Sequence, residues 1–324
     1  MTKHSAIRRS GQVLALAAAG AVALLLPGGA PGGVSVAHAS PRPAAAPVAD
    51  AGPATDVTSS GLLPRRGPLV VAHRGASGYA PENTLAAARA ADEAGATWVE
   101  TDVQRTADGE LVLLHDTTLA RTTDVEQVFP GRAPWNVADF TAAEIDRLDA
   151  GSWYGEEFAG EPVPTLAEFT RELASNGQRL LLELKSPALY PGIEEEILDE
   201  LRGDGWLHER RPGDRVVLQS FDAASVRTVH ELAPRVETGF LGTPAVADLP
   251  AYAAFADQIN PRHTDVTAAY VEEIQSLRGP HGRPVKVYVW TVNDGARAVE
   301  LAGLGVDGII SDVPDVIADA LRRR

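Results

Sequence analysis

The stretch from Val71 to Asp116, VAHRGASGYAPENTLAAARAADEAGATWVETDVQRTADGELVLLHD, carries the pattern that decides the fold. Three short apolar segments in it read as strands, and each ends in polar or charged residues. Burial of a charged group is unfavourable by several kcal/mol unless the group is paired, so charged residues that gather at strand ends of an α/β fold indicate a site rather than packing. These residues are His73, Arg74, Glu100, Asp102 and His115.

Strand-like segments and amphipathic helical patterns alternate from residue 69 onward. Such alternation favours a parallel sheet, and eight repeats within about 255 residues match a (β/α)8 barrel, the TIM-barrel fold. The expected strands are Leu69–Ala72, Trp98–Asp102, Leu180–Leu184, Arg215–Gln219, Glu237–Leu241, Asp257–Asn260, Val285–Trp290 and Gly308–Ser311. The expected helices are Asn83–Ala94, Leu166–Ser175, Gly192–Leu201, Ala223–Leu232, Ala268–Leu277 and Gly295–Ala302.

One further strand-like run, Leu111–Leu114, follows an Asp-Gly pair, which is a hairpin signal between two strands. We therefore expect residues 103–114 to form a hairpin above the barrel that returns His115 toward Asp102. The next stretch, 116–164, has no place in the eightfold count and is predicted to be a small insertion. It either shapes substrate access, as insertions on this face commonly do, or packs on a small core of its own.

The first 39 residues read as a secretory signal. A positively charged start precedes the apolar run Val13–Leu26 and the small-residue cleavage pattern Ala37-His38-Ala39. The pair Arg8-Arg9 permits export by the twin-arginine route, although its surroundings match that signal poorly. An uncleaved membrane anchor is the competing interpretation, but 14 apolar residues are short against the roughly 20 needed to cross a bilayer. We expect cleavage, a secreted protein that begins at Ser40, and no stable membrane anchor.

Composition sets further bounds on the chain. Residues 40–68 are rich in Ala, Pro, Gly, Ser and Thr, which is typical of a disordered linker, so the folded domain is expected at 69–322. No cysteine is present, which excludes disulfides, thiolate metal sites, a cysteine nucleophile and a lipidated cysteine. The predicted mature chain, with 26 basic and 44 acidic residues, has a formal charge of −18. A chain this acidic is a poor partner for nucleic acid, so local cations have to capture any phosphate substrate.

Side-chain direction along the strands brings carboxylates together. Residues i and i+2 share a face, so Glu100 and Asp102 point the same way, as do Glu183 and Lys185 in the segment LLLELK. Three carboxylates on neighbouring strands repel one another unless a cation lies among them or some are protonated. Oxygen ligands without cysteine select a hard divalent cation, Mg²⁺ or Ca²⁺, over zinc. The alternative is that Lys185 is a plain salt-bridge partner, and it has to account for three acidic residues on two buried strands.

Neither histidine alone is strong evidence for a catalytic site. His73 precedes a turn at Gly75 and fits a hydrogen-bonded core position, whereas His115 is followed by Asp116, which could orient or charge it. Beside a metal ion and a lysine, two imidazoles suit cleavage of a phosphodiester, because one takes a proton from the nucleophile and the other protonates the departing alkoxide. The metal ion and cationic side chains stabilise the charge that develops on the phosphoryl oxygens.

The order and spacing of nine short motifs resemble those of the glycerophosphodiester phosphodiesterase family, in its secreted bacterial form, over about residues 69–322. The motifs are His73-Arg74-Gly75, Pro81-Glu82-Asn83-Thr84, Glu100-x-Asp102, His115-Asp116, Arg121-Thr122-Thr123, Pro164-Thr165-Leu166, Glu183-Leu184-Lys185, Ser220-Phe221 and Trp290-Thr291-Val292-Asn293.

The resemblance implies a TIM barrel with the insertion, and it assigns a role to each candidate residue. Phe221 and Trp290 would line the substrate pocket, although an aromatic residue at a strand end is packing as often as recognition. The other roles are a divalent cation on Glu100, Asp102 and Glu183, an acid/base pair of His73 and His115, and phosphate binding by Arg74 and Lys185.

The resulting hypothesis is metal-dependent hydrolysis of a small-molecule glycerophosphodiester to sn-glycerol 3-phosphate and an alcohol, outside the cytoplasm. Either the neighbouring glycerol hydroxyl attacks phosphorus and gives a cyclic phosphate that water opens, or water attacks directly. A phospholipase or a teichoic-acid hydrolase would use the same machinery with a larger apolar or open groove beside the insertion. The alternative from a different class is a secreted protein that binds glycerophosphodiesters without turnover.

Overall fold

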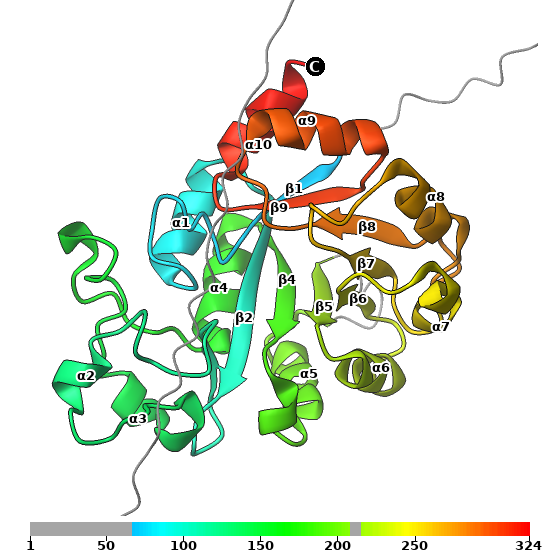
Figure 1. Ribbon diagram of the computed structural model, residues 1–324. Helices are drawn as coiled ribbons and strands as arrows, with labels where there is room; N and C mark the ends of the chain where they lie inside the picture. Colours follow the sequence, from blue (N-terminus) through cyan, green and yellow to red (C-terminus); the bar gives the residue numbers. More distant parts are fainter. Residues whose placement is uncertain (1–66, 208–214) are drawn as a thin grey trace, which may run out of the picture. The chain divides into compact units, whose positions relative to one another are not determined.

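The computed structural model describes residues 67–207 and 215–324. Eight of the strands in these residues are β1 (Leu69–Ala72), β2 (Trp98–Arg105), β4 (Arg179–Leu184), β5 (Val216–Ser220), β6 (Glu237–Leu241), β7 (Gln258–Asn260), β8 (Lys286–Val289) and β9 (Gly308–Ser311). They pair in parallel, and β1 closes the ring by pairing with both β2 and β9 (Figure 1). The predicted TIM barrel is confirmed.

A ninth strand, β3 (Leu111–Leu113), lies outside the ring and completes the predicted hairpin. It pairs antiparallel with the end of β2, so that Val103 faces Leu113. The Leu114 N–H donates to the Asp102 carbonyl at 3.0 Å, which returns the next residue, His115, to the end of the barrel strand. Because this pairing continues beyond the barrel, β2 runs three residues past its predicted end at Asp102.

The barrel interior changes from apolar to acidic along the strands. Leu181 and Glu183 are alternate residues of β4 and share its inner face, so the carboxylate lies one layer above the leucine, at the C-terminal end. Buried side chains from five positions form the apolar layer below, namely Val71, Leu181, Val217, Tyr288 and Ile310.

Helices on the outside cover the barrel strands (Figure 1). They are α1 (Leu85–Glu93), α4 (Leu166–Asn176), α5 (Ile193–Gly203), α6 (Ala223–Leu232), α7 (Leu249–Ala253), α8 (Ala268–Ser276), α9 (Gly295–Leu304) and α10 (Pro314–Arg322). Five begin at a hydroxyl or carboxylate that accepts from the first turn, which satisfies an otherwise unpaired N–H; these caps are Thr84, Thr165, Asp222, Thr267 and Asp294. The helices expected from the sequence include neither α7, which is too short to show a period, nor α10, although the apolar residues of α10 do repeat on one face.

The insertion between β3 and α4 packs on a core of its own. It contains two one-turn helices, α2 (Val125–Val128) and α3 (Ala142–Ile145), and lies beside β2 in Figure 1. Phe140 is fully buried there, and the Arg132 guanidinium stacks 3.8 Å from the centre of its ring. The stretch 116–164 packs on a local core that also includes Val112 and Leu114 of the hairpin, and none of its residues lines the central cavity.

The predicted signal at 1–39 and nearly all of the predicted linker at 40–68 lie outside the described residues. Gly67 and Pro68, the first two described residues, have no regular structure before β1 begins. Among the described residues, no helix combines the length and apolar character that crossing a membrane requires.

Candidate active site

Three carboxylates meet inside the C-terminal end of the barrel. Glu100 and Asp102 extend from β2 and Glu183 from β4, where Asp102 and Glu183 are register partners. One oxygen of each lies within 4.8 Å of the others, and none of the three residues is more than 6% exposed. The predicted convergence of these carboxylates is confirmed.

The turn after β1 carries two further site residues, His73 and Arg74. Arg74 and Gly75 have positive φ angles of 54° and 79°, and this left-handed turn directs the Arg74 N–H to Glu100 Oε2 at 2.9 Å. A Cβ at residue 75 would lie 2.5 Å from the Cβ of Ala87, so the close approach of the turn to α1 requires glycine. The turn therefore holds His73 and Arg74 against the carboxylates.

Two cations and an amide surround Asp102. Lys185 Nζ lies 3.4 Å from Asp102 Oδ1 and 2.8 Å from Glu183 Oε1, as their shared strand face predicts. Arg74 Nε lies 3.3 Å from Asp102 Oδ2, and Asn83 Nδ2 donates to the same oxygen at 3.0 Å. Three carboxylates against two cations leave one excess negative charge if all five are ionised.

This charge balance determines which carboxyl groups hold protons. Burial alone would raise the pKa of Asp102, but Lys185 and Arg74 outweigh it and hold that pKa below its usual value. Burial, and then repulsion from Asp102, raise the pKa of Glu183 to about 8 and that of Glu100 well above its usual value. The cluster therefore lacks positive charge when no further cation is present.

The donor set fits a divalent cation. Glu100, Asp102 and Glu183 offer three convergent oxygens, and Asp102 Oδ1 is buried without a hydrogen-bond partner. Carboxylate oxygens are the ligands of hard ions, and an added positive charge would remove the repulsion that raises two of the three pKa values. These residues could bind a metal ion.

His73 is oriented by a carboxylate from the last barrel strand. Asp312, which directly follows β9, accepts at Oδ1 from His73 Nδ1 at 2.6 Å and from Ser77 Oγ at 2.9 Å, while its Oδ2 accepts from Asn293 Nδ2 at 2.6 Å. Burial would raise the pKa of Asp312, but the hydrogen bond and charge of His73 outweigh it and lower that pKa to about 2. An ionised carboxylate only accepts, so Nδ1 carries the proton and Nε2 is left for the substrate.

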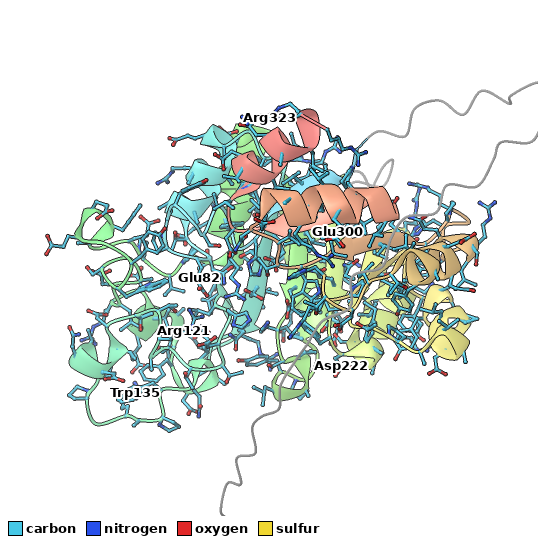
Figure 2. All side chains as sticks on the ribbon, turned by 45° about the horizontal axis from the view of Figure 1, so that its top comes forward. Glu82, Arg121, Trp135, Asp222, Glu300 and Arg323 are labelled. Atoms are coloured by element: carbon cyan, nitrogen blue, oxygen red, sulfur yellow. The ribbon has the colours of Figure 1, made fainter. Side chains whose placement is uncertain are left out.

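His115 is held by a chain of ion pairs that reaches the insertion. Its Nδ1 lies 2.7 Å from Asp116 Oδ1, and Arg121 binds both Asp116 oxygens at 2.7 and 3.1 Å. Arg121 also binds both oxygens of Glu82, which in turn pairs with Arg74 at 2.9 Å; Figure 2 shows Glu82 and Arg121 side by side. The hydrogen bond from Arg121 is the main cause of a strongly lowered Asp116 pKa. Burial and the charge of Arg74 lower the pKa of His115 although Asp102 opposes them, so its ring is neutral near pH 7.

These groups surround one cavity of about 100 Å³. Eight of the nine predicted site residues line it, and the ninth, Asp102, lies behind Arg74 and Lys185. The lining residues are His73, Arg74, Glu100, His115, Glu183, Lys185, Gln219, Phe221, Leu241, Trp290, Thr291 and Ile310.

An aromatic pair forms an apolar wall of the cavity. The rings of Phe221 and Trp290 meet edge to face with centroids 5.5 Å apart, and Phe221 is half exposed. Trp290 Nε1 donates to the Asn260 carbonyl at 2.8 Å, which fixes the indole. An apolar wall facing cationic and acidic groups suits a ligand with a charged end and a carbon-rich end.

Sequence reasoning named Asp116 as the residue that could orient His115, and the structure places it there, but it missed Asp312, which orients His73. Asp312 could have been found, because it directly follows the predicted strand Gly308–Ser311. Glu82, Arg121 and Asn293 stand in quoted motifs, but their contacts join segments far apart in the chain, and no local pattern shows such contacts.

Comparison with known proteins agrees with this geometry. The family model for the glycerophosphoryl diester phosphodiesterase family matches residues 73–316. A glycerophosphodiester phosphodiesterase of Caldanaerobacter subterraneus is 37% identical over 259 residues, which cover 79% of this chain and 98% of the relative. A Bacillus subtilis enzyme of the same description is 32% identical, covering 82% and 90%.

Solved structures give the same result. A phosphodiesterase of Oleispira antarctica, in complex with the product sn-glycerol-3-phosphate, superposes with a TM-score of 0.66 at 32% identity. The match covers 79% of this chain and 97% of that one.

A TIM barrel whose C-terminal end joins an acidic triad, two histidines and two cations defines a phosphoric diester hydrolase. The chain belongs to the glycerophosphoryl diester phosphodiesterase family.

Proposed function

We propose that the protein hydrolyses small glycerophosphodiesters to sn-glycerol 3-phosphate and an alcohol by acid/base catalysis with two histidines. The observation that carries this proposal is that one cavity is lined by His73 and His115 together with Arg74, Lys185 and two members of the acidic triad, Glu100 and Glu183. The Oleispira relative with bound sn-glycerol-3-phosphate supports the identity of the product.

The two histidines take different roles in this proposal. His115 is neutral near pH 7 because burial and Arg74 lower its pKa, so it accepts the proton of the attacking hydroxyl at Nε2. His73 then donates its Nε2 proton to the departing alkoxide, while the ionised Asp312 holds the other ring nitrogen. Both roles need the Nε2 atoms that Asp116 and Asp312 leave free.

Arg74 and Lys185 supply the positive charge that binds the phosphate. Both lie within the carboxylate cluster, and their N–H groups bind the phosphoryl oxygens and stabilise the charge that grows on them. A bound Mg²⁺ or Ca²⁺ at Glu100, Asp102 and Glu183 would supply Lewis-acid stabilisation of the same oxygens. Phe221 and Trp290 hold the carbon-rich end of the substrate against the apolar wall.

The test is release of sn-glycerol 3-phosphate from glycerophosphocholine and from glycerophosphoglycerol. The purified protein is treated with chelator, and Mg²⁺ or Ca²⁺ is then restored separately. Release that depends on the ion supports the proposal and identifies the metal. Binding of either diester without release of product would support the binding protein instead. Phosphorus NMR during the reaction shows whether a cyclic phosphate forms and so separates the two routes of attack.

We further propose that the protein is exported and acts outside the cytoplasm, on the basis of the charged start, apolar run and small-residue site in residues 1–39. Mass spectrometry of the protein from the culture medium should find a mature chain that begins at Ser40. A cell-bound protein with an intact first residue would contradict export with cleavage.

A further inference from the structure

One cation at the mouth of the cavity takes no part in the site described above. Arg262 lies two residues after β7 and is exposed to solvent. Its guanidinium carbon lies 5.5 Å from the centre of the Trp290 ring, and Trp290 lines the cavity. Arg262 therefore stands at the aromatic side of the opening, away from the carboxylate triad on β2 and β4.

Main-chain contacts hold Arg262 in this position. Arg262 forms a parallel bridge with Trp290, and the N–H of His263 donates to the Trp290 carbonyl at 3.1 Å. On the other side of Arg262, the Asn260 carbonyl accepts from the Trp290 indole N–H at 2.8 Å. The segment is thus joined to Trp290 both before and after the arginine, so the backbone places Arg262 beside the indole.

Within the part of the chain that the structure describes, the charge of Arg262 has no ion-pair partner. Among residues 67–207 and 215–324, no carboxylate lies within ion-pair distance of its guanidinium. The nearby Asp265 accepts from the hydroxyl groups of Thr264 at 2.9 Å and Thr243 at 3.3 Å. By contrast, Arg297 on α9 pairs with Glu300 at 2.7 Å.

Stacking on Trp290 occupies only the face of the guanidinium. Its N–H donors lie in the plane of the group and remain free to bind two oxygens of one phosphate or carboxylate. Arg74 and Lys185 are already engaged with Asp102, Glu82 and Glu183, whereas Arg262 has no ion-pair partner among the described residues and is available to a second anionic group.

We propose that Arg262 is a specificity-determining residue, which binds an anionic group on the alcohol half of the substrate and so favours diesters whose alcohol carries a phosphate over diesters whose alcohol is neutral or cationic. This inference rests on the proposed function. The phosphate at the reacting centre binds between Arg74 and Lys185, and the alcohol half extends along Trp290 to the guanidinium.

A carboxylate, Asp222, directly follows Phe221 in the chain, whereas Arg262 stacks on Trp290. A second cavity of about 450 Å³ opens beside Phe221 and is lined by Asp222, which Figure 2 labels. Asp222 Oδ1 caps α6 by accepting from the backbone N–H groups of Ala224 at 2.8 Å and Ser225 at 3.2 Å. These bonds hold Asp222 at the start of α6, on the side of Phe221 rather than of Trp290, over which Arg262 lies.

The experiment compares three diesters on the full protein: glycerophosphoglycerol, the same diester phosphorylated on the terminal hydroxyl of its alcohol half, and glycerophosphocholine. Loss of the diester is followed by phosphorus NMR, and kcat/KM is measured for each. Arg262→Gln should lower the ratio of the phosphorylated to the neutral diester about 10-fold, the loss expected for hydrogen bonds between charged groups. Arg262→Glu should lower it further and raise the ratio for glycerophosphocholine relative to the neutral diester.

The matched control is Arg227→Gln. Arg227 is an exposed arginine that stacks 4.2 Å from the centre of the Phe255 ring and does not line either cavity, so the same change in charge and stacking should leave the ratios unchanged. An unchanged ratio in Arg262→Gln, or an equal fall in Arg227→Gln, would overturn the inference. A wild-type protein that cleaves none of the three diesters would overturn the proposed function instead, so the two failures are distinguishable.

Discussion

At the scale of single residues, one hydrogen bond determines which nitrogen of His73 faces the cavity. Asp312→Asn keeps the size of the side chain but removes an acceptor that is always ionised near neutral pH. We expect kcat to fall about 100-fold or more with little change in KM, because the neutral amide no longer holds the ring in the required tautomer.

Asp315→Asn is the matched control for this measurement. Asp315 accepts from the exposed Tyr79 hydroxyl at 2.7 Å and has no contact with His73. Its kcat should equal that of the wild type. An unchanged kcat in Asp312→Asn would show that Asp312 does not position His73.

Measuring ion binding and turnover on the same variants should distinguish the role of the two histidines from that of the carboxylates. His73→Ala and His115→Ala should each abolish turnover while Mg²⁺ or Ca²⁺ binding, measured by calorimetry, is retained, because neither ring belongs to the acidic triad. Glu100→Ala should lose both, since it removes one of the three oxygens. Full ion affinity in Glu100→Ala would refute the ligand assignment.

At the scale of single elements, α5 carries a buried carboxyl group that should make stability depend on pH. Burial raises the pKa of Glu200 to about 7, and Glu110 and Asp204 add to the effect. Glu200 Oε1 is buried without a hydrogen-bond partner. The folded state therefore holds a proton that the unfolded chain, with its usual value near 4.5, releases.

Because the pKa of Glu200 is higher in the folded than in the unfolded state, the free energy of unfolding decreases as the pH rises. Stability that the protonated Glu200 retains at low pH is lost as the pH rises from about 4.5 through about 7. Glu200→Gln should have little effect at pH 5 and stabilise the protein at pH 8 by roughly 1–2 kcal/mol, a value reduced for the partial exposure of the group. Urea unfolding at the two pH values measures it.

Glu195→Gln on the exposed face of the same helix is the control. Glu195 is exposed to solvent, so its substitution should not change the pH dependence. An equal effect of Glu200→Gln at both pH values would contradict the titration of Glu200 in this range.

At the scale of the whole molecule, the metal ion and the fold should stabilise each other in a way that depends on pH. In the protein without an ion, Glu183 has a pKa of about 8 and Glu100 one well above normal, so stability falls as the pH rises from about 4.5 to about 8. Binding requires the ionised carboxylates and releases their protons, so the gain from the ion should increase over the same range.

Thermal unfolding with chelator and with excess Mg²⁺ or Ca²⁺, at pH 6 and pH 8, tests this linkage. An ion at 100 times its dissociation constant should stabilise the fold by about 2.7 kcal/mol, and the rise in Tm should be larger at pH 8. Glu200→Gln, which lies outside the triad, should keep the ion response. A rise in Tm that is the same at both pH values would contradict the coupling.

The barrel and its charged strand ends could be predicted because both depend on local patterns. Alternating segments show the strands, and the i, i+2 rule places Glu100 with Asp102 and Glu183 with Lys185. Short elements such as α7 have too few residues to show a period, so the pattern could not reveal them.

The sequence by itself determined the fold class, the acidic triad and the two histidines, because strand periodicity and residue chemistry are properties of neighbouring residues. Only the tertiary structure decided that Asp312 orients His73 across 239 positions of the chain. It also decided that Arg121 links the insertion to Glu82, and that the Arg262 guanidinium lies over the Trp290 ring. These contacts arise from the closing of the barrel, which brings the ends of distant strands and loops around one opening.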